Sequence, residues 1–361
     1  MDLLDRLDFH LSPRSKKFLI GAAVVTVGGV VLGAAAAGLA ASAFLRSRRS
    51  FSLSGKVVFI TGGSRGLGLA MAEEFARRGA KVAICARDSD ELVRARQCIE
   101  RETGVTVMTF VCDVSDRAQV ESTVQDVQNH FGTIDVLVNN AGIIAVGPIE
   151  NQTLEDFEEA MKVNFWSQVY ATLAVLPEMR RHPEARIVNI TSIGGKVSVP
   201  HLLPYSCSKF AAVALSEGLR AELGNTGIKV VTVVPGLMRT GSHINAEIKG
   251  KHSQEFTWFS LSGTNPMTSI SVSRAAKQIA DATASGRSEL IISWQAELLA
   301  RFHGIAPELT TEILGLVSRT LPSAGESDEK RKGKDSENAV TKSALTALGQ
   351  MAARRYNQTP A

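Results

Sequence analysis

The chain has 361 residues, of which 44% are hydrophobic and 21% are charged, and its formal net charge is +4. This composition is typical of a globular enzyme with one sizeable core, and it excludes a chain that is disordered throughout. The modest positive charge, without a basic stripe interleaved with aromatic residues, gives no case for nucleic-acid binding.

A long apolar stretch lies near the N-terminus. Residues 18–45 carry no charged side chain, and basic residues flank them on both sides. A helix needs about 20 apolar residues to cross the hydrocarbon layer of a membrane. The sequence therefore predicts a polar segment at 1–17 followed by a single transmembrane helix at 18–45. A cleaved signal peptide is the alternative, because Ala41-Ser42-Ala43 resembles a cleavage site.

A glycine-rich turn follows the first apolar strand candidate, Val57 to Ile60, and precedes a helical pattern from Ala70 to Arg78. Glycines permit a sharp turn and a close approach of backbone to a pyrophosphate, which the helix N-terminus then faces. A second apolar run, Ala80 to Cys85, completes a β-α-β unit. The pattern predicts a dinucleotide site formed by Gly62, Ser64, Arg65, Gly66, Leu67 and Gly68.

Further strand candidates alternate with helical stretches along the rest of the chain. They are Val105 to Val111, Ile134 to Val138, Ile187 to Ile190, Lys229 to Val234 and Leu290 to Ile292. The predicted fold class is α/β, a Rossmann-like doubly wound parallel sheet of about seven strands with helices on both faces. We expect one catalytic domain over 52–322, which includes an apolar helical extension after the last strand.

Polar and glycine residues follow the strand candidates. Ligands of open parallel sheets bind outside the carboxyl ends of the strands. We therefore expect the nucleotide site to include residues at the ends of three further strands, namely Asp113, Val114, Asn140, Ala141, Gly142, Pro235 and Gly236, and Ser192 follows a fourth strand.

Tyr205 and Lys209 are four residues apart, so that on a helix their side chains share one face. A free phenol has a pKa of about 10 and is a poor acid or base at neutral pH. A nearby ammonium group lowers that pKa toward the working range. Tyr205 is therefore the first candidate for proton transfer.

These motifs together resemble the short-chain dehydrogenase/reductase family, over roughly Leu53 to Ile292. The resemblance is carried by Thr-Gly-x-x-x-Gly-x-Gly at 61–68, Asp113-Val114, Asn-Asn-Ala-Gly at 139–142, Asn164, Ser192, Tyr205, Lys209 and Pro235-Gly236 with Thr240. It implies a catalytic tetrad of Asn164, Ser192, Tyr205 and Lys209, and a cofactor contact at Thr240.

Hydride transfer to a carbonyl places negative charge on the substrate oxygen, which hydrogen-bond donors stabilise. We assign that task to Ser192 and Tyr205, and Tyr205 also exchanges the proton. The resemblance implies that Lys209 holds the nicotinamide ribose and that Asn164 fixes a water connecting Lys209 to solvent. The predicted function is interconversion of a carbonyl and an alcohol; a non-catalytic NADP(H)-binding scaffold or sensor at a membrane is the alternative.

The choice of cofactor depends on charge after the second strand. An acidic residue about 20 positions after the glycines favours NAD(H), whereas arginine accommodates the extra phosphate of NADP(H). Ala86 stands at the acidic position, and Arg87 follows it. Arg65 adds a second guanidinium, so the sequence predicts NADP(H). NAD(H) remains the alternative, with Asp88 serving the ribose.

The segment after Gly236 is apolar for a loop region, with Met238, Ile244, Phe256, Trp258, Phe259, Leu261 and Met267. Such residues predict a lid over a pocket for a small lipophilic carbonyl or alcohol. A packed flank of the core or a dimer face is the alternative. Two glycines of the apolar stretch, Gly29 and Gly33, have a spacing that permits helix pairing, so a homo-oligomer is a further hypothesis.

The four cysteines have neither paired nor metal-ligand spacing, so we expect neither a disulfide framework nor a metal site. Free thiols are typical of reduced compartments, which places the catalytic domain on the cytosolic side of a membrane. Residues 323–361 alternate acidic and basic side chains with few apolar ones. Such a stretch buries too little surface to fold, and we expect a flexible tail with at most a short helix around 344–356.

Overall fold

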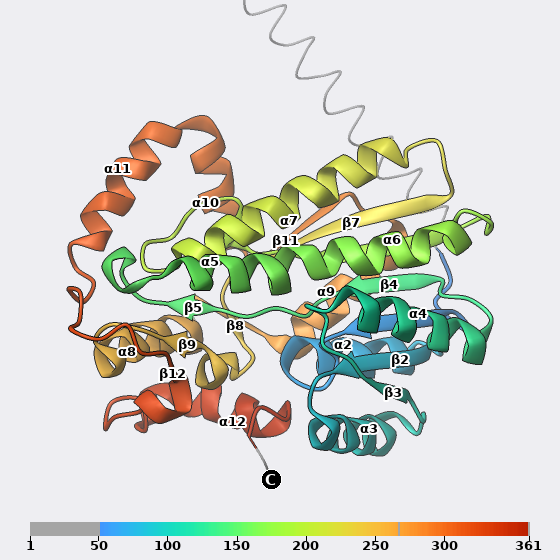
Figure 1. The fold of residues 1–361 in the computed structure, drawn as a ribbon, viewed down its shortest axis with the longest axis horizontal. Helices are drawn as coiled ribbons and strands as arrows, with labels where there is room; N and C mark the ends of the chain where they lie inside the picture. The colour runs from blue at the N-terminus through green and yellow to red at the C-terminus, as the bar shows by residue number, and fades with distance from the viewer. Residues whose placement is uncertain (1–50, 266–267, 360–361) are drawn as a thin grey trace, which may run out of the picture. The chain divides into compact units, whose positions relative to one another are not determined.

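The computed structural model describes residues 51–265 and 268–359 (Figure 1). All of the described residues belong to one compact unit. The predicted polar segment and transmembrane helix, together with Met267, lie outside the described residues. Among the helices that are described, none combines the length and the apolar character that crossing a membrane requires.

A seven-stranded sheet lies at the centre of the domain, with strand order β11-β7-β6-β4-β1-β2-β3. Every neighbouring pair in it is parallel, which confirms the predicted sheet. The strands are β1 (Val57–Thr61), β2 (Lys81–Ala86), β3 (Met108–Val111), β4 (Val136–Asn139), β6 (Ala185–Ile190), β7 (Ile228–Pro235) and β11 (Glu289–Ile292).

Helices cover both faces of this sheet, and alternate residues of each strand contribute to two separate cores. Val58 and Ile60 of β1 pack on one face, which α2 (Gly66–Arg77), α3 (Ser89–Thr103) and α9 (Val272–Ser285) cover. Val57 and Phe59 pack on the other face. That face lies under α4 (Arg117–Phe131), α6 (Ser167–Met179) and α7 (Leu203–Glu222), with α5 (Leu154–Met161) beside α7. Strands buried on both faces read as continuous apolar runs, which is why the sequence revealed them.

Smaller elements form the part of the domain beyond the carboxyl ends of β4 and β7. They are β5 (Ala145–Val146), β8 (Met238–Arg239), β9 (Glu247–Ile248), α8 (His252–Thr264) and β10 (Ile270–Ser271). Two helices follow β11, α10 (Trp294–Ile305) and α11 (Pro307–Ser318), which is the predicted apolar extension.

The charged C-terminal stretch packs against the domain instead of forming a free tail. It contributes β12 (Arg331–Lys332), which pairs antiparallel with β9, and α12 (Ala347–Arg355). The expectation that this stretch buries too little surface to fold is wrong for the described residues, although the short helix is confirmed. The reason is charge complementarity that composition does not reveal, since Lys332 pairs with Glu247 at 2.8 Å.

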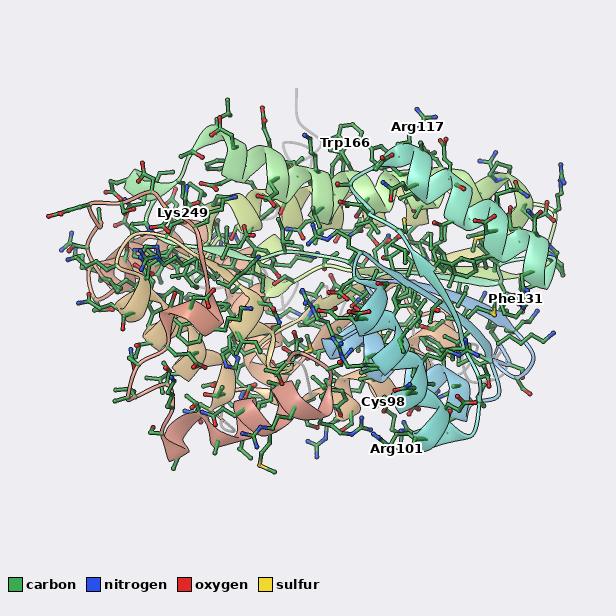
Figure 2. The ribbon with its side chains drawn as sticks, turned by 60° about the horizontal axis from the view of Figure 1, so that its bottom comes forward. Cys98, Arg101, Arg117, Phe131, Trp166 and Lys249 are labelled. Carbon is green, nitrogen blue, oxygen red and sulfur yellow. The ribbon has the colours of Figure 1, made fainter. Side chains whose placement is uncertain are left out.

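The clearest example is a network around a buried carboxylate. Lys249, at the end of the domain opposite Phe131 (Figure 2), forms an ion pair of 2.6 Å with Asp156 of α5. Lys330 from the C-terminal stretch contacts the other Asp156 oxygen at 3.0 Å. The two lysines hold the pKa of Asp156 below its ordinary value, although its burial acts in the opposite direction. Lys330 thus anchors the C-terminal stretch to the domain through the same carboxylate that Lys249 contacts.

Candidate active site

In the glycine-rich turn between β1 and α2, backbone segments approach one another so closely that there is no room for side chains at two of the glycines. A Cβ on Gly68 would lie 2.1 Å from the Gly62 carbonyl oxygen, and one on Gly62 would lie 2.8 Å from Ala141 Cα. Asn140 Nδ2 donates to the carbonyls of Thr61 and Gly62, both at 3.0 Å. The predicted residues at the ends of β1 and β4 therefore come together, and the segment after β4 holds the turn.

Lys209 on α7 is almost completely buried beside the end of β6. Its Nζ donates to the Ile190 carbonyl at 3.0 Å and lies 5.8 Å from the centroid of the Tyr205 ring. Burial lowers the pKa of Lys209 to about 8, because an ammonium group loses its hydration there. The i and i+4 geometry expected for Tyr205 and Lys209 is present.

The phenol of Tyr205 does not have the lowered pKa that the sequence predicted. Burial raises it, and a hydrogen bond with the Ser192 side chain acts in the opposite direction. Lys209 instead directs its ammonium group to a backbone carbonyl. Desolvation therefore outweighs the hydrogen bond with Ser192, and the pKa of Tyr205 lies above its ordinary value.

Ser192 follows β6 and faces Tyr205. Its Oγ accepts a hydrogen bond from the Gly194 amide at 3.0 Å, which fixes the side chain at the start of a short 3₁₀ turn, Ile193–Gly195. A Cβ on Gly194 would lie only 3.2 Å from the Tyr205 ring. The ring thus packs directly against this turn, which brings two predicted catalytic hydroxyl groups together.

Asn164 lies in a π-helical turn, Lys162–Trp166, between α5 and α6. Its fully buried amide accepts from the Ile143 amide at 2.9 Å and donates to the Ile143 carbonyl at 3.1 Å and to Ser208 Oγ at 3.0 Å. A Cβ on Gly142 would lie 2.8 Å from Asn164 Oδ1 and 3.6 Å from Lys209 Nζ. All four predicted catalytic residues therefore lie at one place, and Gly142 leaves the space between two of them open.

Ser208 is a buried residue that the sequence analysis missed. It accepts from Asn164 and donates to the Tyr205 carbonyl at 2.7 Å. The sequence could have indicated it, because Ser208 lies between Tyr205 and Lys209 on the buried face of the same helix. It joins Asn164 to the backbone of α7.

The adenosine end of the predicted site contains an unexpected carboxylate. Arg65 Nη1 pairs with Glu91 Oε1 at 2.7 Å, and Ser64 Oγ donates to Glu91 Oε2 at 2.9 Å. Arg87 is exposed after β2. Asp88 caps α3 by accepting from the Glu91 amide at 2.8 Å, which gives it a structural role. Arg65 therefore lies in the glycine turn and Arg87 at the end of β2, as predicted, but Arg65 is already paired with Glu91.

The remaining predicted cofactor contacts also lie at strand ends. Asp113 Oδ1 accepts from the amide and the hydroxyl of Ser115, at 2.9 and 2.8 Å, next to the buried Val114. Gly236 follows Pro235 at the end of β7, where a Cβ would lie 2.7 Å from Ser293 Oγ. Thr240 Oγ1 donates to Ser242 Oγ at 2.7 Å in the following loop.

The apolar segment after Gly236 is partly core. Ile244 and Phe256 are buried, and Phe256 packs with Val146 and Ile248. Trp258 and Phe259 pack at the edge of this cluster, beside Leu202 and Ile144, which lie just before α7 and after the Asn-Asn-Ala-Gly segment. For these residues the alternative of a packed flank is the better description.

The four cysteines are free, and within the described residues no group of three or more His, Cys, Asp or Glu side chains is arranged to hold a metal ion. The family model for short chain dehydrogenases matches residues 56–249. The chain belongs to this family.

Known proteins share this region. A dehydrogenase/reductase SDR family protein 7-like from Anopheles gambiae is 41% identical over 55% of this chain and 64% of its own length. The putative oxidoreductase SadH of Mycobacterium tuberculosis is 32% identical over 70% of this chain and 92% of its own. The crystal structure of L-sorbose reductase from Gluconobacter frateurii, complexed with NADPH and L-sorbose, has a TM-score of 0.60 at 26% identity, covering 68% of this chain and 97% of that one.

Because the ammonium group of Lys209 is buried, we expect this residue to lower the stability of the fold while it serves activity. With a folded pKa of about 8 against an ordinary 10.5, the folded protein binds fewer protons than the unfolded chain between these values, so stability rises with pH there. We expect Lys209→Met to abolish activity. We also expect it to raise the unfolding free energy at pH 7 by on the order of 1–3 kcal/mol, because removing the cost of the buried charge outweighs the loss of one hydrogen bond.

The comparison is urea unfolding at pH 7 and pH 10, where the gain is expected to shrink. Lys196→Met is the control, because ion pairs with Glu217 and Glu289 raise the pKa of Lys196 despite its burial. That substitution is expected to lower stability instead. A loss of stability in Lys209→Met of the same size would contradict the buried-charge interpretation.

Proposed function

We propose that the protein is an NADP(H)-dependent oxidoreductase that interconverts a carbonyl and an alcohol group on a small lipophilic substrate. The observation that carries this proposal is the meeting of Asn164, Ser192, Tyr205 and Lys209 at the ends of β4 and β6. The glycine turn lies at the end of the neighbouring strand, β1, and the first turn of α2 holds no acidic residue. A helix N-terminus of this kind suits a pyrophosphate, and its first amide, that of Gly66, donates to the Tyr356 carbonyl.

The residues have distinct tasks in this proposal. A bound nicotinamide supplies or accepts the hydride. The Ser192 and Tyr205 hydroxyl groups donate to the substrate oxygen as negative charge develops on it, and Tyr205 then gives up its proton. Partial burial raises the pKa of the Tyr205 phenol, so the group holds the proton that this step requires. Lys209 and Asn164 are the buried members of the group, and they position the segments that carry the two hydroxyl groups.

Substitution of Tyr205 by Phe tests this role. We expect Tyr205→Phe to lower carbonyl reduction by about 10²–10⁴-fold, since it removes the proton donor, while NADPH binding is retained. The measurement is NADPH consumption with a panel of lipophilic ketones and aldehydes. Tyr170→Phe on α6 is the control, because Tyr170 stacks on Trp166 at a centroid distance of 6.0 Å. A wild-type chain that binds NADPH but reduces no substrate would favour the scaffold alternative.

NADP(H) is proposed over NAD(H) because Arg87 stands exposed at the end of β2 and Arg65 lies in the glycine turn. The NADPH complex of the related L-sorbose reductase supports this choice. The pairing of Arg65 with Glu91 leaves Arg87 as the stronger candidate for the extra phosphate.

We expect Arg87→Ala to raise the KM for NADPH at least about tenfold, because a charged phosphate contact is lost, and to leave the KM for NADH nearly unchanged. Steady-state kinetics with both cofactors would measure the two values. Equal changes for NADPH and NADH would show that Arg87 does not read the phosphate.

Membrane attachment through 18–45, with the domain on the cytosolic side, is also proposed. It is supported by the uncharged length of that stretch. Large apolar side chains exposed along α10 and α11, at one edge of the domain (Figure 1), add support: Trp294, Leu298, Ile305, Leu309 and Leu316. Apolar surface of this kind suits contact with lipid and a lipophilic substrate.

The full chain is expected to stay in the membrane fraction after alkaline carbonate extraction, whereas residues 51–361 alone are released. Protease added outside intact cells should leave the domain uncut. Mass spectrometry of the purified N-terminus checks the signal-peptide alternative. A mature chain that begins just after Ala43 would reject the anchor.

A further inference from the structure

The end of the chain returns to the glycine-rich turn. Directly after α12, the Tyr356 carbonyl accepts a hydrogen bond from the Gly66 amide at 2.9 Å. The next residue, Asn357, donates from Nδ2 to the Ser64 carbonyl at 2.9 Å and to the Glu91 carbonyl at 3.0 Å. One amide group therefore ties the turn to the start of α3, across 293 and 266 residues of sequence.

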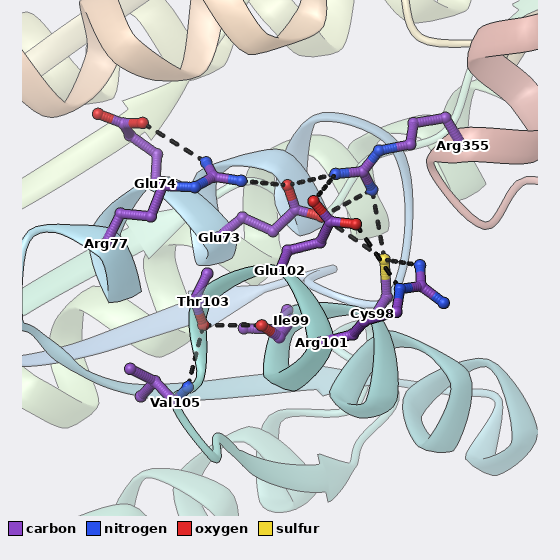
Figure 3. Close-up of polar contacts among 10 residues, drawn as sticks. All are labelled: Glu73, Glu74, Arg77, Cys98, Ile99, Arg101, Glu102, Thr103, Val105 and Arg355. Atoms are coloured by element: carbon purple, nitrogen blue, oxygen red, sulfur yellow. Dashed lines mark hydrogen bonds and ion pairs between the residues drawn. The ribbon is translucent and has the colours of Figure 1, made fainter.

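Charged contacts hold this end in place. Both terminal nitrogens of Arg355 contact Glu73 of α2, at 2.9 and 3.0 Å, and one also lies 3.4 Å from Glu102 of α3 (Figure 3). Arg94 of α3 donates to Asn357 Oδ1 at 3.0 Å. A paired Arg–carboxylate fork is among the stronger and more specific contacts available to a side chain. The position of Asn357 is thus fixed from two helices.

The residue after Asn357, Gln358, contacts the loop that follows β8. Asn245, in the loop after β8, donates from Nδ2 to the carbonyl and the side-chain oxygen of Gln358, at 3.2 and 2.8 Å. A Cβ on Gly241 would lie 2.4 Å from Ala353 Cα. The chain end therefore fastens the glycine turn to the loop that begins with the predicted contact Thr240.

We propose that Asn357 is a positioning residue for the dinucleotide. The proposal rests on the function proposed above, and it adds a C-terminal element to the binding site. The two carbonyls that Asn357 holds belong to Ser64 and Glu91, whose side chains, with Arg65, form the hydrogen-bonded group at the adenosine end. A turn and helix that are fixed beforehand lose less freedom when the nucleotide binds, which strengthens binding.

The backbone of Asn357 guides the choice of variant. Its φ of +54° lies in the left-handed region, which glycine adopts without strain and alanine does not. Asn357→Gly therefore removes the side-chain hydrogen bonds while leaving the backbone conformation accessible. Asn357→Asp keeps the shape of the side chain and removes its two N–H donors, which gives a second, independent variant.

The experiment is a direct titration of full-length wild-type and variant protein with NADPH, without substrate, followed by steady-state kinetics. We expect the Kd for NADPH to rise about tenfold in Asn357→Gly and Asn357→Asp, as two hydrogen bonds to the site are lost. The kcat at saturating NADPH should stay within about twofold, because the catalytic hydroxyl groups are untouched.

Gln350→Ala is the matched control. Gln350 is a half-buried amide residue of α12 whose side chain donates to Thr341 and Thr346, within the C-terminal stretch itself. Its Kd for NADPH should equal that of the wild type. An equal rise in this variant would show a general effect of loosening the C-terminal stretch and would overturn the proposed role of Asn357.

An unchanged Kd in both Asn357 variants would also overturn the proposal. A lower Kd would overturn it too, since it would show that the chain end competes with the nucleotide. Failure of the wild-type chain to bind NADPH is a distinct result, because it removes the proposed function on which this role rests.

Discussion

The site depends on a positive charge buried at the junction of β6 and α7. The Lys209 ammonium group has the Ile190 carbonyl as its hydrogen-bond partner, and the cost of its burial lowers its pKa. A buried charge needs well-placed hydrogen-bond partners to offset its loss of hydration. Gly142, which has no side chain, leaves the required space, and the Asn164 amide secures the neighbouring segment to α7 through Ser208.

A second consequence concerns the phenol. The surroundings that bury Lys209 also half-bury Tyr205, and this desolvation raises the pKa of the phenol, while its hydrogen bond with Ser192 acts in the opposite direction. The raised pKa thus arises from burial, a property of the whole packing around α7 and the turn after β6.

The family match ends at residue 249, and several elements lie beyond it. Among them are α8, the exposed apolar helices α10 and α11, and a C-terminal stretch that pairs its charges with those of the domain. Each of these surrounds the shared nucleotide-binding core. Among them, the C-terminal stretch also contacts the glycine turn through Asn357, which donates to the Ser64 carbonyl.

The sequence by itself determined the order of strands and helices, the glycine turn and the identity of the four catalytic candidates. The strands, the helices and the glycine turn depend on local periodicity and short spacing, as in the apolar run of β1. The Tyr205 and Lys209 pair has such a spacing too, whereas the catalytic roles of Asn164 and Ser192 were implied by the family resemblance. Only the tertiary structure decided that Glu91 pairs with Arg65, that burial raises the pKa of Tyr205, and that Asn357 holds the glycine turn. Those outcomes depend on desolvation and on contacts between distant residues, and neither leaves a local pattern in the chain.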